Sequence, residues 1–136
     1  MKSTFHGLRI AVLALGCYWA LLFVSTHIPA HLLVTLHQSD KVIHATAFAI
    51  LAFLIAWAVP TNDARPLRNV FQAALIAVIY AGIDELSQIP VGRTADWNDF
   101  FADCTGICVG LSLYTLIRGF LFKLGIKFIQ DPIQNR

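Results

Sequence analysis

Five of the eight acidic residues in this 136-residue chain fall within residues 84–103, between segments that are almost purely apolar. Side chains of this kind can bond hydroxyl and amide groups, hold a cation, or act as a general acid and base pair. A charge inside a membrane-spanning segment is costly, and such charges usually face the interior of a helix bundle and mark function. The five acids are Asp84, Glu85, Asp96, Asp99 and Asp103.

The first part of this cluster predicts one polar helix face. Spacings of three and four residues place Gln88 on the same face as Asp84 and Glu85. Acids near a helix C-terminus meet the negative end of the helix dipole, so their presence there indicates a purpose. Two interpretations stay open: Asp84 and Glu85 belong to a binding or catalytic site, or Asp84 closes the bundle through a hydrogen bond.

The second part of the cluster predicts an acidic stripe. Asp96, Asp99 and Asp103 are separated by three, four and seven residues, which aligns them on one helical stripe. Asp96 or Asp99 is also suited to cap the N-terminus of the following helix. Since one cap needs one acid, Asp103 is the hardest of the three to explain by capping, and we expect it to take part in the site.

The remaining candidates are two cations, an acid and a histidine. Arg93 is the only cation in the turn, and its forked donors suit a carboxylate partner or an anionic ligand. Asp40, Lys41 and His44 open an earlier apolar segment, where Asp40 is suited to capping and His44 lies one turn further in. His44 is either a satisfied core histidine or a member of the site.

Several chemistries find no support in the sequence. No metal-binding motif is present and no metal ligand is predicted, although carboxylates with a histidine are able to hold Mg²⁺, Mn²⁺ or Ca²⁺. The three cysteines lack metal or redox spacing, and there is neither a phosphate-binding glycine loop nor a nucleophile with an evident base. The positive charges form no basic patch, which excludes nucleic-acid binding.

Composition determines the elements that must position these residues. Hydrophobic residues make up 57% of the chain and charged residues 13%, far from the balance of a soluble domain. Four apolar stretches have spanning length, at about 9–28, 42–59, 69–89 and 99–117. We therefore predict an all-α, polytopic membrane protein, a four-transmembrane-helix bundle forming a single membrane domain over residues 1–136. Residues 118–136 are predicted to form an amphipathic tail on the inner membrane surface, unless they extend the last span.

Lys and Arg counts predict the orientation. The N-terminal segment, the loop between spans two and three, and the C-terminal end together hold eight of these residues, and the opposite side holds two, Lys41 and Arg93. Both termini are therefore predicted to be cytoplasmic, and residues 84–103 to face outward.

Three segments carry a family resemblance over roughly residues 25–110. They are "STHIP", "DKVIHATAF" and "DELSQIPVGRTADWNDFFADCTG". Together they resemble the VanZ-like family of small bacterial integral membrane proteins, whose outline is D-K-x-x-H, D-E-x-x-Q, a P-G-R-like turn and D-x-x-x-N-x-x-G. The chain departs from this outline at Asp103, where the family usually has Asn. The matching residues are Asp40, Lys41, His44, Asp84, Glu85, Gln88, Arg93, Asp96, Asp99 and Gly106.

The resemblance implies a bacterial cytoplasmic-membrane protein associated with low-level resistance to the glycopeptide teicoplanin, and it implies no particular reaction. Our leading hypothesis is an outward polar site, built by spans two, three and four, that binds a lipid head group or a cell-wall precursor. The first alternative is an enzyme that uses a carboxylate pair on an envelope lipid, with Asp84, Glu85 and His44 as catalytic candidates. The second is a purely structural or scaffold protein. No cofactor is predicted, and the expected partners are membrane lipids.

Overall fold

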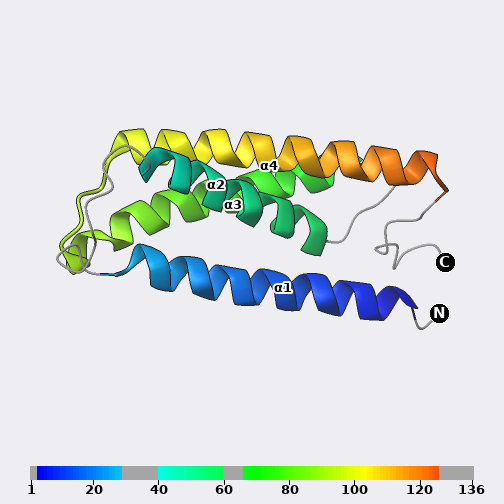
Figure 1. Ribbon diagram of the computed structural model, residues 1–136, viewed down its shortest axis with the longest axis horizontal. Helices are drawn as coiled ribbons and strands as arrows, with labels where there is room; N and C mark the ends of the chain where they lie inside the picture. Colours follow the sequence, from blue (N-terminus) through cyan, green and yellow to red (C-terminus); the bar gives the residue numbers. More distant parts are fainter. Residues whose placement is uncertain (1–2, 29–39, 60–65, 126–136) are drawn as a thin grey trace.

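The computed structural model describes residues 3–28, 40–59 and 66–125. These residues form four long helices, α1 (Ser3–Thr26), α2 (Asp40–Ala58), α3 (Pro66–Ser87) and α4 (Trp97–Lys123), with a short 3₁₀ helix, η2 (Ile89–Val91), after α3. Helices α1 and α3 run in one direction and α2 and α4 in the other (Figure 1). The all-α prediction is confirmed.

Three of the helical segments, Asp40–Ala58, Leu67–Val91 and Trp97–Lys123, are long and apolar enough to cross a membrane, and α1 contributes a shorter apolar stretch, Ile10–Thr26. Large apolar side chains such as Phe71, Leu86 and Leu116 are exposed on the outside of the bundle, as a lipid-facing surface requires. The chain is therefore a multi-pass membrane protein with four apolar helices.

The predicted boundaries differ from the observed ones at one important place. The fourth span was predicted to end at residue 117, but α4 continues to Lys123. Residues 118–123 therefore continue the helix, which agrees with the alternative that the last span extends further. The predicted surface helix beyond residue 125 lies outside the described residues.

Small residues bring α2 and α4 into backbone contact. A Cβ placed on Gly106 would overlap the backbone of Ala45, and a Cβ on Gly110 would overlap that of Ala49. This is a small-xxx-small contact, which lets two helices approach closely in a membrane where packing replaces the hydrophobic effect. The contact fixes the register of the two parallel helices and places the beginning of α2 beside the beginning of α4.

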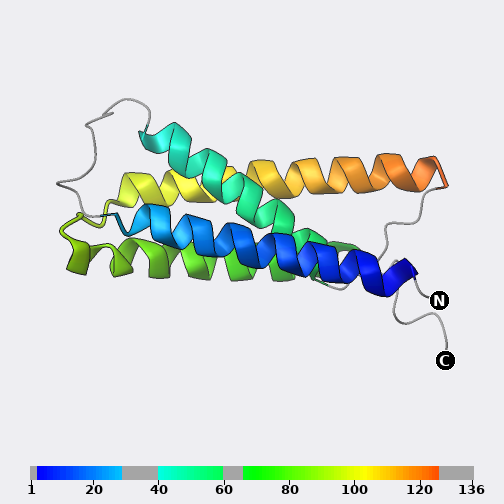
Figure 2. The ribbon, with the colours of Figure 1, turned by 60° about the horizontal axis from the view of Figure 1, so that its bottom comes forward.

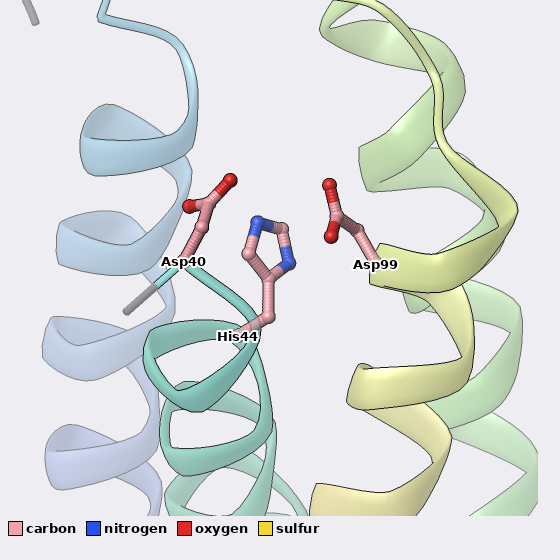
Figure 3. Close-up of side chains that lie close together, drawn as sticks. All are labelled: Asp40, His44 and Asp99. Atoms are coloured by element: carbon pink, nitrogen blue, oxygen red, sulfur yellow. The ribbon is translucent and has the colours of Figure 1, made fainter. Parts of the chain in front are cut away.

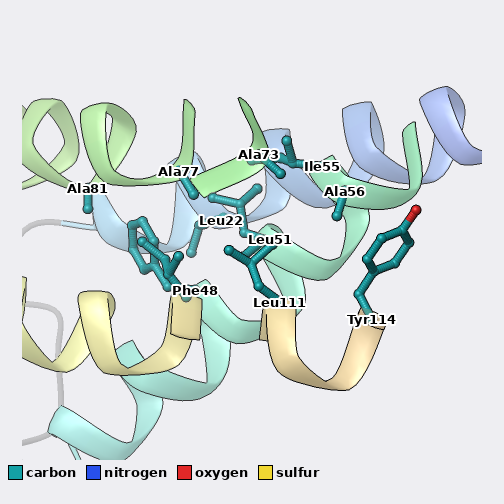
Figure 4. Packing of buried hydrophobic residues seen from close by; sticks show 12 residues of the cluster. Leu22, Phe48, Leu51, Ile55, Ala56, Ala73, Ala77, Ala81, Leu111 and Tyr114 are labelled. Atoms are coloured by element: carbon teal, nitrogen blue, oxygen red, sulfur yellow. The ribbon is translucent and has the colours of Figure 1, made fainter. Parts of the chain in front are cut away.

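The interior contains alanines, larger aliphatic residues and aromatic rings (Figure 4). Ala73, Ala77 and Ala81 form a fully buried strip along α3, facing Phe48 and Leu51 of α2 within the same core. Such small side chains let α3 lie close to its neighbours.

Helix α1 is attached to this core by polar and aromatic contacts. The Tyr18 hydroxyl donates to the carbonyl of Ala47 in α2 at 2.9 Å, and the Trp19 and Tyr80 rings form an edge-to-face pair with centroids 4.9 Å apart. All four helices meet at one end of the bundle, where α1 and α3 finish and α2 and α4 begin (Figures 1 and 2).

Candidate functional site

The end where α1 and α3 finish carries the ten candidate residues, and most of them belong to three groups of contacts. Seven of the ten lie on α2, α3 or α4, and the other three lie in the connection from α3 to α4. Each group has a different chemical character.

The first group surrounds Asp84, which is 1% exposed. Its Oδ1 accepts hydrogen bonds from the Thr26 hydroxyl at 2.9 Å and the Tyr80 hydroxyl at 3.3 Å, and its Oδ2 accepts one from the Gln88 amide at 3.0 Å. Both carboxylate oxygens are therefore satisfied inside the protein. Asp84 joins α1 to α3, which matches the bundle-closing alternative raised from the sequence.

The second group is the connection between α3 and α4. Asp96 caps α4, since its side chain accepts from the Asn98 backbone N–H at 2.9 Å. Arg93 donates from NH1 to the carbonyl of Thr26 at 3.3 Å, and within the described part of the chain it forms no ion pair with a carboxylate. The sequence left two roles open for Arg93, a carboxylate partner and an anionic ligand. In place of the first, Arg93 contacts the end of α1, where a helix leaves its last carbonyls unsatisfied.

The third group is a buried cluster made by one residue from each of α2, α3 and α4. We call His44, Glu85 and Asp103 the inner triad. They are 6%, 6% and 0% exposed, respectively. His44 Nδ1 lies 3.0 Å from Asp103 Oδ1 and 3.9 Å from Glu85 Oε1. Glu85 also accepts from the backbone N–H of Asp96 through Oε2, at 3.1 Å.

Two oxygens of the inner triad lack partners among the described residues. Glu85 Oε1 and Asp103 Oδ2 are buried and accept no hydrogen bond there. Buried polar atoms in native proteins are nearly always paired, so such atoms need an explanation. This feature separates the inner triad from Asp84, whose oxygens are all in use.

The inner triad is continuous with a more accessible group. The His44 imidazole lies between the carboxyl groups of Asp40 and Asp99 (Figure 3), and both of these acids are half-buried. Lys41, the next residue along α2, is exposed. His44 therefore connects a buried acidic pair with a partly exposed one.

The helix dipoles stabilise the acids at the starts of α2 and α4 but not the acid at the end of α3. Asp40 and Asp99 occupy the first turns of α2 and α4, where the positive ends of the helix dipoles stabilise carboxylates. Glu85 lies near the C-terminus of α3, where the helix dipole destabilises a carboxylate. The hydrogen bond from the backbone N–H of Asp96 to Glu85 offsets part of this effect.

Sequence reasoning gathered the acids of the polar end but assigned no role there to four residues that help to build it. Thr26 and Tyr80, which donate to Asp84, gave no signal beyond an ordinary hydroxyl in an apolar helix. Gly106 was noted only as a motif match, and with Gly110 it forms a G-x-x-x-G spacing that was available in the sequence.

Fold and polar end together define a class: a multi-pass helical membrane protein with a buried carboxylate–histidine cluster near one end of the bundle. The family model described as VanZ/LLP1 matches residues 10–118, most of the chain. The chain therefore belongs to the VanZ/LLP1 family, as its motifs predicted. No curated protein and no solved structure matches it.

Proposed function

We propose that this VanZ/LLP1 family member is a bacterial inner-membrane protein whose polar end faces outward and binds an envelope component, either a lipid head group or a cell-wall precursor. The orientation rests on charge. Arg68, Arg118 and Lys123 lie at the end where α3 begins and α4 finishes, whereas Lys41 and Arg93 lie at the polar end. By the positive-inside rule, the first of these ends is cytoplasmic.

The observation that carries the proposal is the pair of buried oxygens without partners, Glu85 Oε1 and Asp103 Oδ2. In a network that only holds the bundle together, buried oxygens are usually satisfied, as both oxygens of Asp84 are. An unsatisfied, buried pair beside an accessible group is instead suited to hydroxyl, amide or cationic groups of a ligand. Lys41 is placed to meet an anionic group of the same ligand, because it is exposed at the start of α2.

The decisive experiment compares retained ligands. Protein extracted in a mild detergent is examined by native mass spectrometry for an envelope lipid or precursor that survives purification. We expect Glu85→Gln and Lys41→Ala to lose the adduct, and Asp96→Asn to keep it because Asn caps a helix as well as Asp does. In cells, the first two variants should also change teicoplanin susceptibility at unchanged protein levels. Retention of the same adduct by all three variants contradicts the proposal.

One observation favours a second candidate, a membrane enzyme acting on the same ligand class. The Nδ1 of His44 lies between two carboxylates that occupy different surroundings, since Glu85 also accepts a backbone N–H and Asp103 does not. Two carboxyl groups held in different environments are the usual basis of an acid and base pair. Glu85 and His44 therefore remain catalytic candidates, and Asp84 is withdrawn because its oxygens are occupied. Turnover of a labelled envelope lipid that Glu85→Gln abolishes would establish this function instead of simple binding.

A further inference from the structure

We propose that the inner triad of His44, Glu85 and Asp103 binds one divalent transition-metal ion, of the Mn²⁺ or Zn²⁺ type. One ligand atom from each of these side chains lies within 4.8 Å of the other two. The proposal deepens the proposed function and rests on the same two unpaired oxygens, Glu85 Oε1 and Asp103 Oδ2.

The spacing of the ligand atoms suits a single ion. Two ligands at about 2.1 Å from a tetrahedral ion are separated by about 3.4 Å. His44 Nδ1 lies 3.0 Å from Asp103 Oδ1 and 3.9 Å from Glu85 Oε1, which brackets that value. The distances from His44 Nδ1 to both carboxylates are therefore compatible with one shared ion.

The unpaired oxygens point to a cation rather than to an internal hydrogen bond. With Glu85 and Asp103 ionised, Glu85 Oε1 and Asp103 Oδ2 are acceptors without donors among the described residues. Protonation of one carboxyl group would supply a single donor, which satisfies the other oxygen only if the two oxygens come within hydrogen-bond distance. A divalent ion bonds the oxygens directly, and its charge balances the two carboxylates where burying a net charge is costly.

The ligand types narrow the choice of ion. Ca²⁺ and Mg²⁺ prefer sites made entirely of oxygen, whereas an imidazole nitrogen with carboxylates suits Mn²⁺, Fe²⁺ or Zn²⁺. Asp40, His44 and Asp99 form a second group with compatible distances. Its acids are only half-buried, so we assign it to the approach of the ion, since half-exposed acidic groups attract cations towards the buried ligands.

Mn²⁺ is the appropriate first probe because free cysteines at positions 17, 104 and 108 would also attract Zn²⁺. The full chain, purified in detergent and treated with a chelator, is titrated with MnCl₂ and followed by electron paramagnetic resonance. We expect one saturable Mn²⁺ per chain. Spin-echo modulation should show directly bound nitrogen, and ¹⁵N-histidine labelling should change that signal.

Variants then locate the ion. Glu85→Gln and Asp103→Asn should each weaken Mn²⁺ binding by at least ~100-fold, more than the loss of a second-shell partner usually costs, and His44→Gln should remove the nitrogen modulation. Asp96→Asn, an acid-to-amide change at the same end, should leave affinity unchanged. Monodisperse elution of each variant shows that it is folded. The nitrogen modulation is measured on the unmodified chain, so this part of the test stands even if a variant fails to fold.

Three results would overturn the assignment: no saturable Mn²⁺ in the unmodified chain, saturable binding without nitrogen modulation, or equal affinity in Glu85→Gln and Asp96→Asn. A stronger effect of Asp40→Asn than of Glu85→Gln would move the ion to the half-exposed group and likewise overturn it. The titration contains no envelope component. An unmodified chain that binds no saturable Mn²⁺ but retains the lipid adduct therefore refutes the metal site alone. An unmodified chain that binds Mn²⁺ but retains no adduct refutes the proposed function alone.

Discussion

Replacing Gly106 with Ala is expected to separate α2 from α4 where the inner triad is assembled. The new Cβ would lie 2.9 Å from the Cα and 2.7 Å from the carbonyl carbon of Ala45, and closer still to the carbonyl oxygen, whereas ordinary contacts begin at 3.4 Å. Backbone atoms have no alternative rotamer, so the helices must move apart by at least about 0.7 Å.

Moving the helices apart also lengthens the hydrogen bond between His44 of α2 and Asp103 of α4. His44 Nδ1 and Asp103 Oδ1 are 3.0 Å apart, and a further ~0.7 Å exceeds the range of a good hydrogen bond. Overpacking typically costs about 1–3 kcal/mol, and a lost hydrogen bond to a charged group costs about 1.5–3 kcal/mol. The better helix propensity of Ala returns about 0.5–1 kcal/mol. The net loss of stability is therefore about 1.5–5.5 kcal/mol.

The assay is unfolding of the purified protein in mixed micelles by increasing denaturing detergent, followed by far-ultraviolet circular dichroism. Gly119→Ala is the matched control because nothing lies within 4 Å of the added Cβ on the same helix, and we expect unchanged or slightly greater stability. Equal stability of the Gly106→Ala and Gly119→Ala proteins would refute the proposed backbone contact between α2 and α4.

Three further predictions concern the polar end. Asp84→Asn should lower the free energy of unfolding by about 1–3 kcal/mol, because an amide cannot accept from the Thr26, Tyr80 and Gln88 donors together. A double-mutant cycle with Thr26→Val measures the bond between α1 and Asp84, and purely additive losses would contradict that bond. Asp96→Ala should cost about 1 kcal/mol through loss of the α4 cap while Asp96→Asn costs little, which thermal unfolding can compare; equal losses would argue against capping. In a cysteine-free background, a membrane-impermeant maleimide should label Thr94→Cys in intact cells but Leu124→Cys only after lysis, and the opposite pattern would reverse the proposed orientation.

The sequence predicts some features of this protein better than others, because only some of them depend on a single segment of the chain. The apolar runs predict the helices directly, because a chain in lipid must satisfy its backbone groups internally and a helix does so within one segment. The boundaries are less well determined, since α4 continues to Lys123 past the basic Arg118, where composition alone suggested an end. The clustering of acids likewise shows that residues 84–103 are chemically unusual.

The role of each acid required the tertiary structure. Asp84 and Glu85 are adjacent in the sequence and equally acidic, yet Asp84 faces Thr26 of α1 and is fully bonded, whereas Glu85 faces His44 and keeps one oxygen without a partner among the described residues. A local pattern cannot separate them, because neighbouring positions on a helix point about 100° apart and meet different helices.

The sequence by itself therefore determined an all-α membrane protein of the VanZ/LLP1 family with a polar end, since hydropathy and motif spacing are properties of single segments. Only the tertiary structure decided that His44, Glu85 and Asp103 form one buried group, and that Arg93 reaches the end of α1 instead of an acid. The physical reason is the packing of α2 on α4. Glycine lets their backbones touch, and that contact sets which side chains from distant segments share a site.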